Sequence, residues 1–346
     1  MDCRAGVAAA VVISLGSAGA AGQRSPSVRG SEVTFTVAGD ASDPPRIVAD
    51  FNGWDRGVMT PSGDGRFYTL RVTLDPAARI EYLVAYRGRF ELDPGNPRTV
   101  PSPAGPPRSE LWMPQYRPPA PLPPARTHGS VEEVPFVSRS GEGRRIRVYV
   151  PAGAARPLPV LYVHDGEIFA GALDLPSVLD SLIETRRIAP ALVAFIDAVD
   201  RHDDYEPGSP FRAVFTGEIV PVIEAGYGVA AGRRALMGLS RSTVGALDTC
   251  VNGGIAFEAC ALIAPAIQSA QLPRLTGSAG AATRFFIETG TYDLPLVSDA
   301  RALRRALEQR HAPVNYTESP QGHNHTAFRG RLPDVMKALF PPAGRS

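Results

Sequence analysis

The sequence predicts an α/β protein in which a small β-sandwich precedes a mostly parallel sheet with helices on both faces. Three observations predict this. Short alternating segments fill residues 31–100, prolines concentrate after them, and from residue 131 buried apolar runs alternate with helical patterns. The chain has 346 residues, 44% of them hydrophobic, and a formal net charge of +1. It is therefore long enough for two domains, and nothing in its charge favours nucleic acid as a partner.

Residues 1–20 have the pattern of a signal peptide. An apolar run over residues 5–15 is followed by the small residues 16–20, which close in an Ala-x-Ala cleavage pattern. The run is too short to span a bilayer, and no other stretch is long enough to do so. We therefore expect an exported, periplasmic or secreted protein whose mature chain begins near Ala21.

Residues 31–100 are expected to form the sandwich, with half-buried strands over residues 69–74 and 80–86. The segments 50–54, 81–84 and 88–94 resemble the carbohydrate-binding modules of glycogen-binding regulatory subunits and starch-branching enzymes, which implies an immunoglobulin-like fold. In that family two tryptophans and a lysine hold the glucan. Trp54 fits the first tryptophan, but Leu83 and Phe90 stand at the other two places. Trp54 is kept as a candidate substrate-binding residue, although packing at a sandwich edge or against the second domain is the favoured interpretation.

Residues 101–130 are expected to be a linker. Proline pairs at 106–107, 118–119 and 123–124 favour extended polyproline segments over a packed core. Apolar residues at 111–113 and Tyr116 indicate that the linker runs over the domain surfaces rather than hanging free. Residues 131–341 then form the second domain.

Residues 233–247 contain the pattern around which the second domain is organised. A short apolar run ends at Gly238, and a helical pattern with small residues begins just after Ser240. A serine on such a strand-to-helix turn is the nucleophile of α/β-hydrolases, so this fold is expected for residues 131–341. The usual second glycine of the turn is replaced by Ser242. An ordinary turn of small residues would give the same short pattern.

A serine nucleophile needs a histidine base and an acid that orients it, and in this fold the order is serine, acid, histidine. Asp293 follows the buried run at 284–290, where the acid is expected. His323 follows the last predicted strand and is the candidate base, with His325 as the alternative. A metal site on this histidine pair would need further ligands, and the sequence offers no suitable cluster. No metal or organic cofactor is therefore expected.

Two backbone N–H groups are candidates for the oxyanion hole. One belongs to Arg241, directly after the nucleophile. The other belongs to Glu167, in the loop that follows the buried strand at 159–163, where Gly166 permits a close approach.

Five segments together resemble the enterochelin esterase and esterase D family of α/β-hydrolases: residues 161–167, 201–205, 218–221, 234–241 and 322–324. The resemblance covers the chain from about residue 131 to its end. It implies a serine esterase with Ser240 as nucleophile, His323 as base and Asp293 as acid. The chain departs from the family at Ser242 and at Asp204, where glutamate is more usual. Arg201 and Tyr205 are candidate substrate-binding residues, although an ion pair that fastens a loop is the favoured interpretation of residues 201–205.

The sequence leaves the ester open. Catecholate siderophore lactones, feruloyl or acetyl esters on polysaccharides and simple esters are cleaved within the family, so the expected partner is a small-molecule or glycan-linked ester. A non-catalytic glycan-binding protein on the same scaffold, and acyl transfer to an alcohol, remain alternatives. The sequence does not decide whether Cys250 and Cys260 form a disulfide or remain free, nor the oligomeric state.

Overall fold

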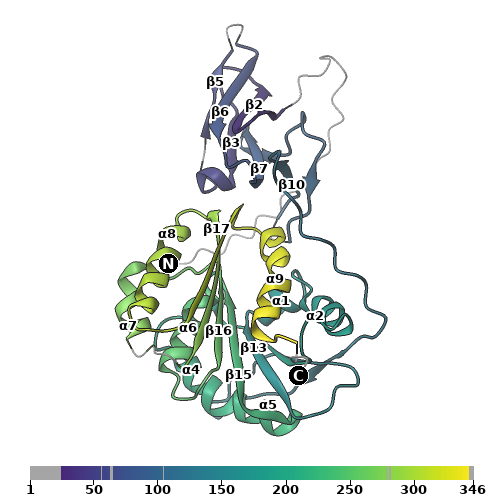
Figure 1. Ribbon diagram of the computed structural model, residues 1–346. Coiled ribbons are helices and arrows are strands. Elements are labelled where there is room, and N and C mark those ends of the chain that lie inside the picture. The colour runs from purple at the N-terminus through teal and green to yellow at the C-terminus, as the bar shows by residue number, and fades with distance from the viewer. Residues whose placement is uncertain are drawn as a thin grey trace.

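The computed structural model describes residues 25–55, 57–62, 65–103, 105–277, 279 and 282–342. The expected signal peptide lies outside these residues. Figure 1 shows two domains. The sandwich lies at the end of the large sheet where the central strands have their carboxyl ends. Among the described residues, no helix has the length and apolar character needed to cross a membrane.

The sandwich consists of two antiparallel sheets. One has the order β1 (Ser27–Arg29), β2 (Glu32–Ala38), β6 (Phe67–Thr73) and β5 (Thr60–Pro61). The other has the order β4 (Gly57–Val58), β3 (Arg46–Ala49), β7 (Arg79–Tyr86), β10 (Arg108–Trp112) and β9 (Thr99–Val100), and β8 (Arg89–Glu91) also pairs with β7. Alternate residues of β2 are buried between the sheets, as the period of two in this segment predicts.

The sandwich extends further along the chain than its sequence indicated. Strand β10 lies within the expected linker, yet it pairs antiparallel with both β7 and β9. Leu111 and Met113 are buried in the sandwich core, which agrees with the expectation that this part of the linker packs. Prolines on both sides of the strand gave the segment the composition of a linker. The irregular connection therefore begins after Trp112 rather than after residue 100.

The second domain contains an eight-stranded sheet. Its order is β11 (Ser130–Val134), β12 (Ile146–Val150), β14 (Leu192–Ile196), β13 (Leu158–His164), β15 (Val229–Leu239), β16 (Ala259–Ile263), β17 (Arg284–Tyr292) and β18 (Val314–Gly322). The pairs from β14 to β18 are parallel, whereas β11 and β12 are antiparallel. The predicted mostly parallel sheet is confirmed.

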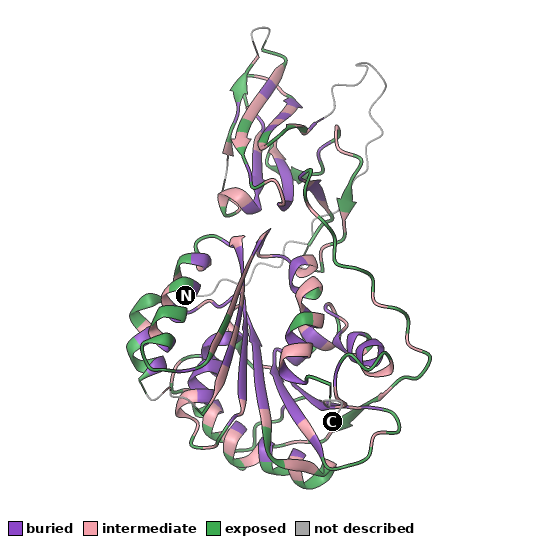
Figure 2. Cartoon of the chain, in the orientation of Figure 1, coloured by how far each residue is buried: buried purple, intermediate pink, exposed green. Residues whose placement is uncertain are grey.

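Helices cover both faces of this sheet. One face packs against α1 (Gly166–Ala170), α2 (Leu175–Glu184) and α9 (His325–Leu339). The other packs against α4 (Pro210–Val214), the π-helical turn Phe215–Ile219, α5 (Val220–Tyr227), α6 (Ser242–Asn252), α7 (Leu272–Thr276) and α8 (Leu296–Glu308). Figure 2 shows the central strands buried along most of their length. Cys250 and Cys260 are both buried free thiols in this arrangement.

Candidate active site

Ser240 occupies a tight turn between β15 and α6. Its φ angle of 54° lies in the left-handed region, which a residue with a side chain rarely adopts. Gly238 is required on steric grounds, because a Cβ atom there would lie 2.6 Å from the backbone oxygen of Ser242. Ser240 is partly exposed in a strained conformation, and Gly238 lies close to the Ser242 backbone. Together these features have the geometry of a nucleophile elbow.

Ser242, which stands where this turn usually has glycine, closes the turn with its side chain. Its buried hydroxyl accepts a hydrogen bond from the Leu239 N–H at 2.9 Å and donates one to the Leu239 carbonyl at 3.0 Å. The departure from the usual pattern therefore adds two contacts across the elbow instead of opening it.

We expect Ser242→Ala to destabilise the protein by about 1–3 kcal/mol, because both backbone groups of Leu239 lose these buried hydrogen bonds. Thermal unfolding should show a melting temperature lower by several degrees. Ser298→Ala is the matched control, since the exposed Ser298 hydroxyl donates to a backbone carbonyl at 2.8 Å. Equal shifts in the two variants would contradict the role given to Ser242.

Asp293 and His323 are brought together by the register of the last two strands. Tyr292 at the end of β17 pairs with Gly322 at the end of β18. The residues that follow these two, Asp293 and His323, therefore lie side by side. His323 Nδ1 lies 3.0 Å from one Asp293 carboxylate oxygen and 3.1 Å from the other. Asp293 is buried, whereas the His323 side chain is 35% exposed. With Nδ1 held by the acid, the other ring nitrogen, Nε2, is the one available to take a proton.

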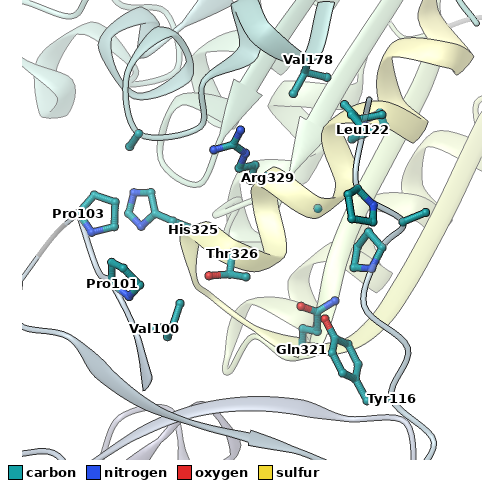
Figure 3. Close-up of a pocket in the computed structure, with 16 residues that line it drawn as sticks. Val100, Pro101, Pro103, Tyr116, Leu122, Val178, Gln321, His325, Thr326 and Arg329 are labelled. Carbon is teal, nitrogen blue, oxygen red and sulfur yellow. The ribbon is translucent and has the colours of Figure 1, made fainter. Parts of the chain in front are cut away.

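His325, the alternative base, begins helix α9 and is half-buried. Burial and the nearby Arg108 charge lower its pKa. Figure 3 shows His325 and Arg329 extending from α9 toward a cavity of about 590 Å³, between the proline-rich segment and α2. Neither Asp293 nor Ser240 lines this cavity, so His325 belongs to a flanking surface.

The expected oxyanion residues both lie where a helix begins. Arg241 immediately precedes α6 and Glu167 is the second residue of α1, and N–H groups at a helix start lack an intrahelical acceptor. Val163 of β13 pairs with Met237 of β15, so the two helix starts follow neighbouring strands. Gly166 permits the approach, because a Cβ there would lie 2.6 Å from the Ile196 backbone nitrogen.

Arg201 and Tyr205 fasten the loop that carries Glu167. The Arg201 guanidinium binds both Asp165 carboxylate oxygens, at 2.8 and 2.7 Å. The Asp165 N–H donates to the Tyr205 hydroxyl at 2.9 Å. Tyr205 is only 1% exposed, so the expectation that it contacts substrate is corrected: its hydroxyl is used inside the protein. Sequence reasoning missed Asp165, although its position between a buried strand and a helix start marked it as part of this loop.

Trp54 lies at the side of the sandwich that faces the second domain. Its indole N–H donates to Asp50 at 3.1 Å, and the Arg108 guanidinium lies 4.2 Å from the ring centre. A Cβ on the preceding Gly53 would lie 3.6 Å from Leu294, in the loop after β17. Phe90, in contrast, is 54% exposed on β8. Trp54 is thus half-buried, with its N–H bonded within the sandwich and the Arg108 guanidinium over its ring.

A small cavity of about 10 Å³ is lined by Glu288, Arg331 and Gly322, the residue before His323. Burial raises the pKa of Glu288 from 4.5 to about 7, and the Arg331 charge and a Thr317 hydrogen bond oppose this only in part. Between those pH values the folded protein binds more protons than the unfolded chain, so the free energy of unfolding falls as pH rises.

Glu288→Gln removes this ionisation. We expect the variant to gain stability relative to the native chain between pH 5 and pH 8, by up to about 3 kcal/mol. Denaturant unfolding across this pH range measures the difference, with the exposed Glu308→Gln as control. A constant difference between the Glu288 variant and the native chain would contradict the buried, proton-binding carboxyl group.

Comparison with known proteins agrees with this geometry. A family model described as putative esterase matches residues 138–279. The iron(III) salmochelin esterase of Escherichia coli is 30% identical over 90 residues, which are 25% of this chain and 22% of that protein. The curated relative is thus matched over about a fifth of its length.

Solved structures that share the fold include two esterases. The enterobactin esterase of Shigella flexneri, determined in the presence of enterobactin, has a TM-score of 0.69 at 18% identity over 89% of this chain and 92% of its own. A feruloyl esterase module of Clostridium thermocellum has a TM-score of 0.53 at 15% identity over 66% of this chain and 95% of its own. Residues 138–279 thus match the putative esterase family model, and the chain shares the fold of these esterases.

Proposed function

We propose that the protein is a serine carboxylester hydrolase that uses Ser240, His323 and Asp293. The observation that carries the proposal is the contact of His323 Nδ1 with a buried aspartate, at the sheet edge where the strained Ser240 turn also lies. This pairing fixes the tautomer of the imidazole and stabilises the imidazolium that forms when the base takes a proton.

In the first half of the reaction, Ser240 Oγ attacks the ester carbonyl carbon while His323 Nε2 accepts the hydroxyl proton. The backbone N–H groups of Arg241 and Glu167 donate to the oxyanion of the tetrahedral intermediate. Collapse of this intermediate breaks the bond to the alcohol oxygen, which receives the proton from His323. In the second half, water attacks the acyl-enzyme with the same base, and the acid and free Ser240 are released.

For the substrate we propose a siderophore ester of the enterobactin type in preference to a polysaccharide ester. The likeness to the enterobactin esterase covers 89% of this chain, against 66% for the feruloyl esterase module. The likeness to the enterobactin esterase therefore extends beyond the second domain into the sandwich. Within the sandwich, Arg108 and Trp54 lie on the side that faces His325. Export to the periplasm or medium, as the N-terminal sequence predicts, belongs to the same proposal.

The test is covalent labelling followed by a substrate comparison. A fluorophosphonate should modify the peptide that contains Ser240, and mass spectrometry locates the label. The value of kcat/KM should then be higher for enterobactin than for ethyl ferulate. Absence of labelling at Ser240 would overturn the mechanism, whereas a preference for ethyl ferulate would overturn only the substrate assignment.

A further inference from the structure

His323 lies between two residues that the sandwich contacts directly. Gly322 precedes it, and a Cβ at this position would lie 2.2 Å from Asp50 Cγ and 2.3 Å from its Oδ1. The φ angle of Gly322 is not in the left-handed region, so glycine is needed here for space and not for backbone conformation. The Asp50 side chain therefore rests against the backbone just before the proposed base.

Asn324 follows His323 and is held from the other domain by both ends of its amide. Its Nδ2 donates to Asp50 Oδ2 at 3.1 Å, and its Oδ1 accepts from Arg79 Nη1 at 3.0 Å. The same Oδ1 accepts from the Ala327 N–H at 2.9 Å and so caps helix α9. Turning the amide over would place donors against donors, so the interaction admits one orientation.

The sandwich groups that make these contacts are themselves fixed. Arg79 is fully buried and binds Glu110 at 2.5 Å and Glu81 at 2.8 Å. Asp50 accepts from the Glu81 N–H at 2.8 Å and from the Trp54 indole N–H at 3.1 Å. Burial, reinforced by the Glu81 charge, raises the pKa of Asp50 to about 7. A buried network satisfied in this way is rigid, because each group is oriented by others.

The acid side of the pair has a contact of the same kind. The Asp75 N–H, from the sandwich, donates to the hydroxyl of Tyr292 at 2.8 Å, and Tyr292 immediately precedes Asp293. Contacts between the domains thus fall on residues adjacent to both members of the pair.

We propose that Asp50 and Arg79 are positioning residues for His323, so that the sandwich completes the active site by fixing the loop that carries the base. The inference rests on the proposed function, in which His323 is the base. A displacement of about 1 Å in a catalytic group can lower the rate about 100-fold. Contacts that fix both neighbours of His323 should therefore keep kcat high.

Two variants, one in each domain, remove the contacts of Asn324 with the sandwich. Asp50→Ala deletes the acceptor for Asn324, while Asn324→Ser keeps a good helix cap but cannot span the distance to Asp50 and Arg79. We expect each to lower kcat about 10- to 100-fold, with a much smaller change in KM. Asp50→Asn should recover part of the loss, because its amide oxygen can still accept from the Glu81 N–H and from Asn324, whereas its Nδ2 would replace the acceptor of the Trp54 N–H.

Asp93→Ala is the matched control for Asp50→Ala. Asp93 is also a buried sandwich carboxylate, with bonds to Ser25 and Tyr82 at 2.8 Å, and its partners belong to the sandwich. Below the melting temperature of each variant, Asp93→Ala should leave kcat within about twofold of the native value, as expected for a site outside the catalytic machinery. Equal losses of kcat in Asp50→Ala and Asp93→Ala would overturn the proposal.

A readout that does not depend on turnover separates this inference from the proposed function. The ring signals of His323, assigned by comparison with His323→Gln, should shift in Asp50→Ala and in Asn324→Ser but not in Asp93→Ala. Unchanged signals in the first two variants would overturn the positioning role even for an active esterase. Turnover that survives Ser240→Ala would instead overturn the proposed mechanism, whatever these signals show.

Discussion

Ser240→Ala should abolish hydrolysis of p-nitrophenyl acetate, with a loss of kcat of about 10⁴-fold or more. The hydroxyl that attacks the carbonyl is gone, and water has no comparable position from which to replace it. The strain at this residue is carried by the backbone, whose φ angle is 54°, so the substitution removes the nucleophile without removing the turn. Steady-state rates of the native chain and the variant measure the effect.

The folded state has to be preserved for this result to be informative. Ser240 makes hydrogen bonds through its backbone, to Ile263 and Thr243 among others, so alanine should leave the melting temperature nearly unchanged. An intact variant that still hydrolyses the ester at the native rate would exclude Ser240 as nucleophile.

His323→Ala should lower kcat to a similar degree, whereas His325→Ala should retain most of the activity. His323 is the histidine whose Nδ1 contacts Asp293, and His325 faces the cavity beside the proline-rich segment. The two side chains are two positions apart and both contact the Phe328 ring, at centroid distances of 4.9 and 6.3 Å, so the pair forms a close internal control.

The two histidine variants should be compared at several pH values with p-nitrophenyl acetate. Loss of the base should also remove the rise of activity with pH that general-base catalysis gives, and His325→Ala should keep it. Equal losses from the two substitutions would mean that the base has been assigned to the wrong residue.

Much of the second domain could be predicted because its signals are local. Buried strands and amphipathic helices alternate in the sequence, and a parallel sheet places the carboxyl ends of its strands at one edge. The order Ser240, Asp293, His323 therefore placed candidates on one side of the sheet, and the structure brings the last two into contact. Their catalytic roles remain the proposal that the variants above test.

The features that sequence reasoning missed depend on contacts between distant segments. Strand β10 was assigned to the linker because flanking prolines dominated its composition, while β7, one of the two strands with which it pairs, lies about thirty residues earlier. Tyr205 was kept as a candidate substrate-binding residue beside the favoured loop-fastening interpretation, because whether a tyrosine lines a cleft or supports a loop depends on its burial. The Asp50–Asn324 contact spans 274 positions, and neither residue type signals it locally.

The buried polar contacts between the sandwich and the second domain also constrain how the protein can be engineered. A second domain produced alone would leave Asn324 without Arg79 and Asp50, and Gly322 with empty space where the Asp50 carboxylate had rested. A chimera with a foreign sandwich would face the same mismatch unless the buried set around Arg79 were transferred with it. We therefore expect the two domains to function only when they are transferred together, and not as interchangeable modules.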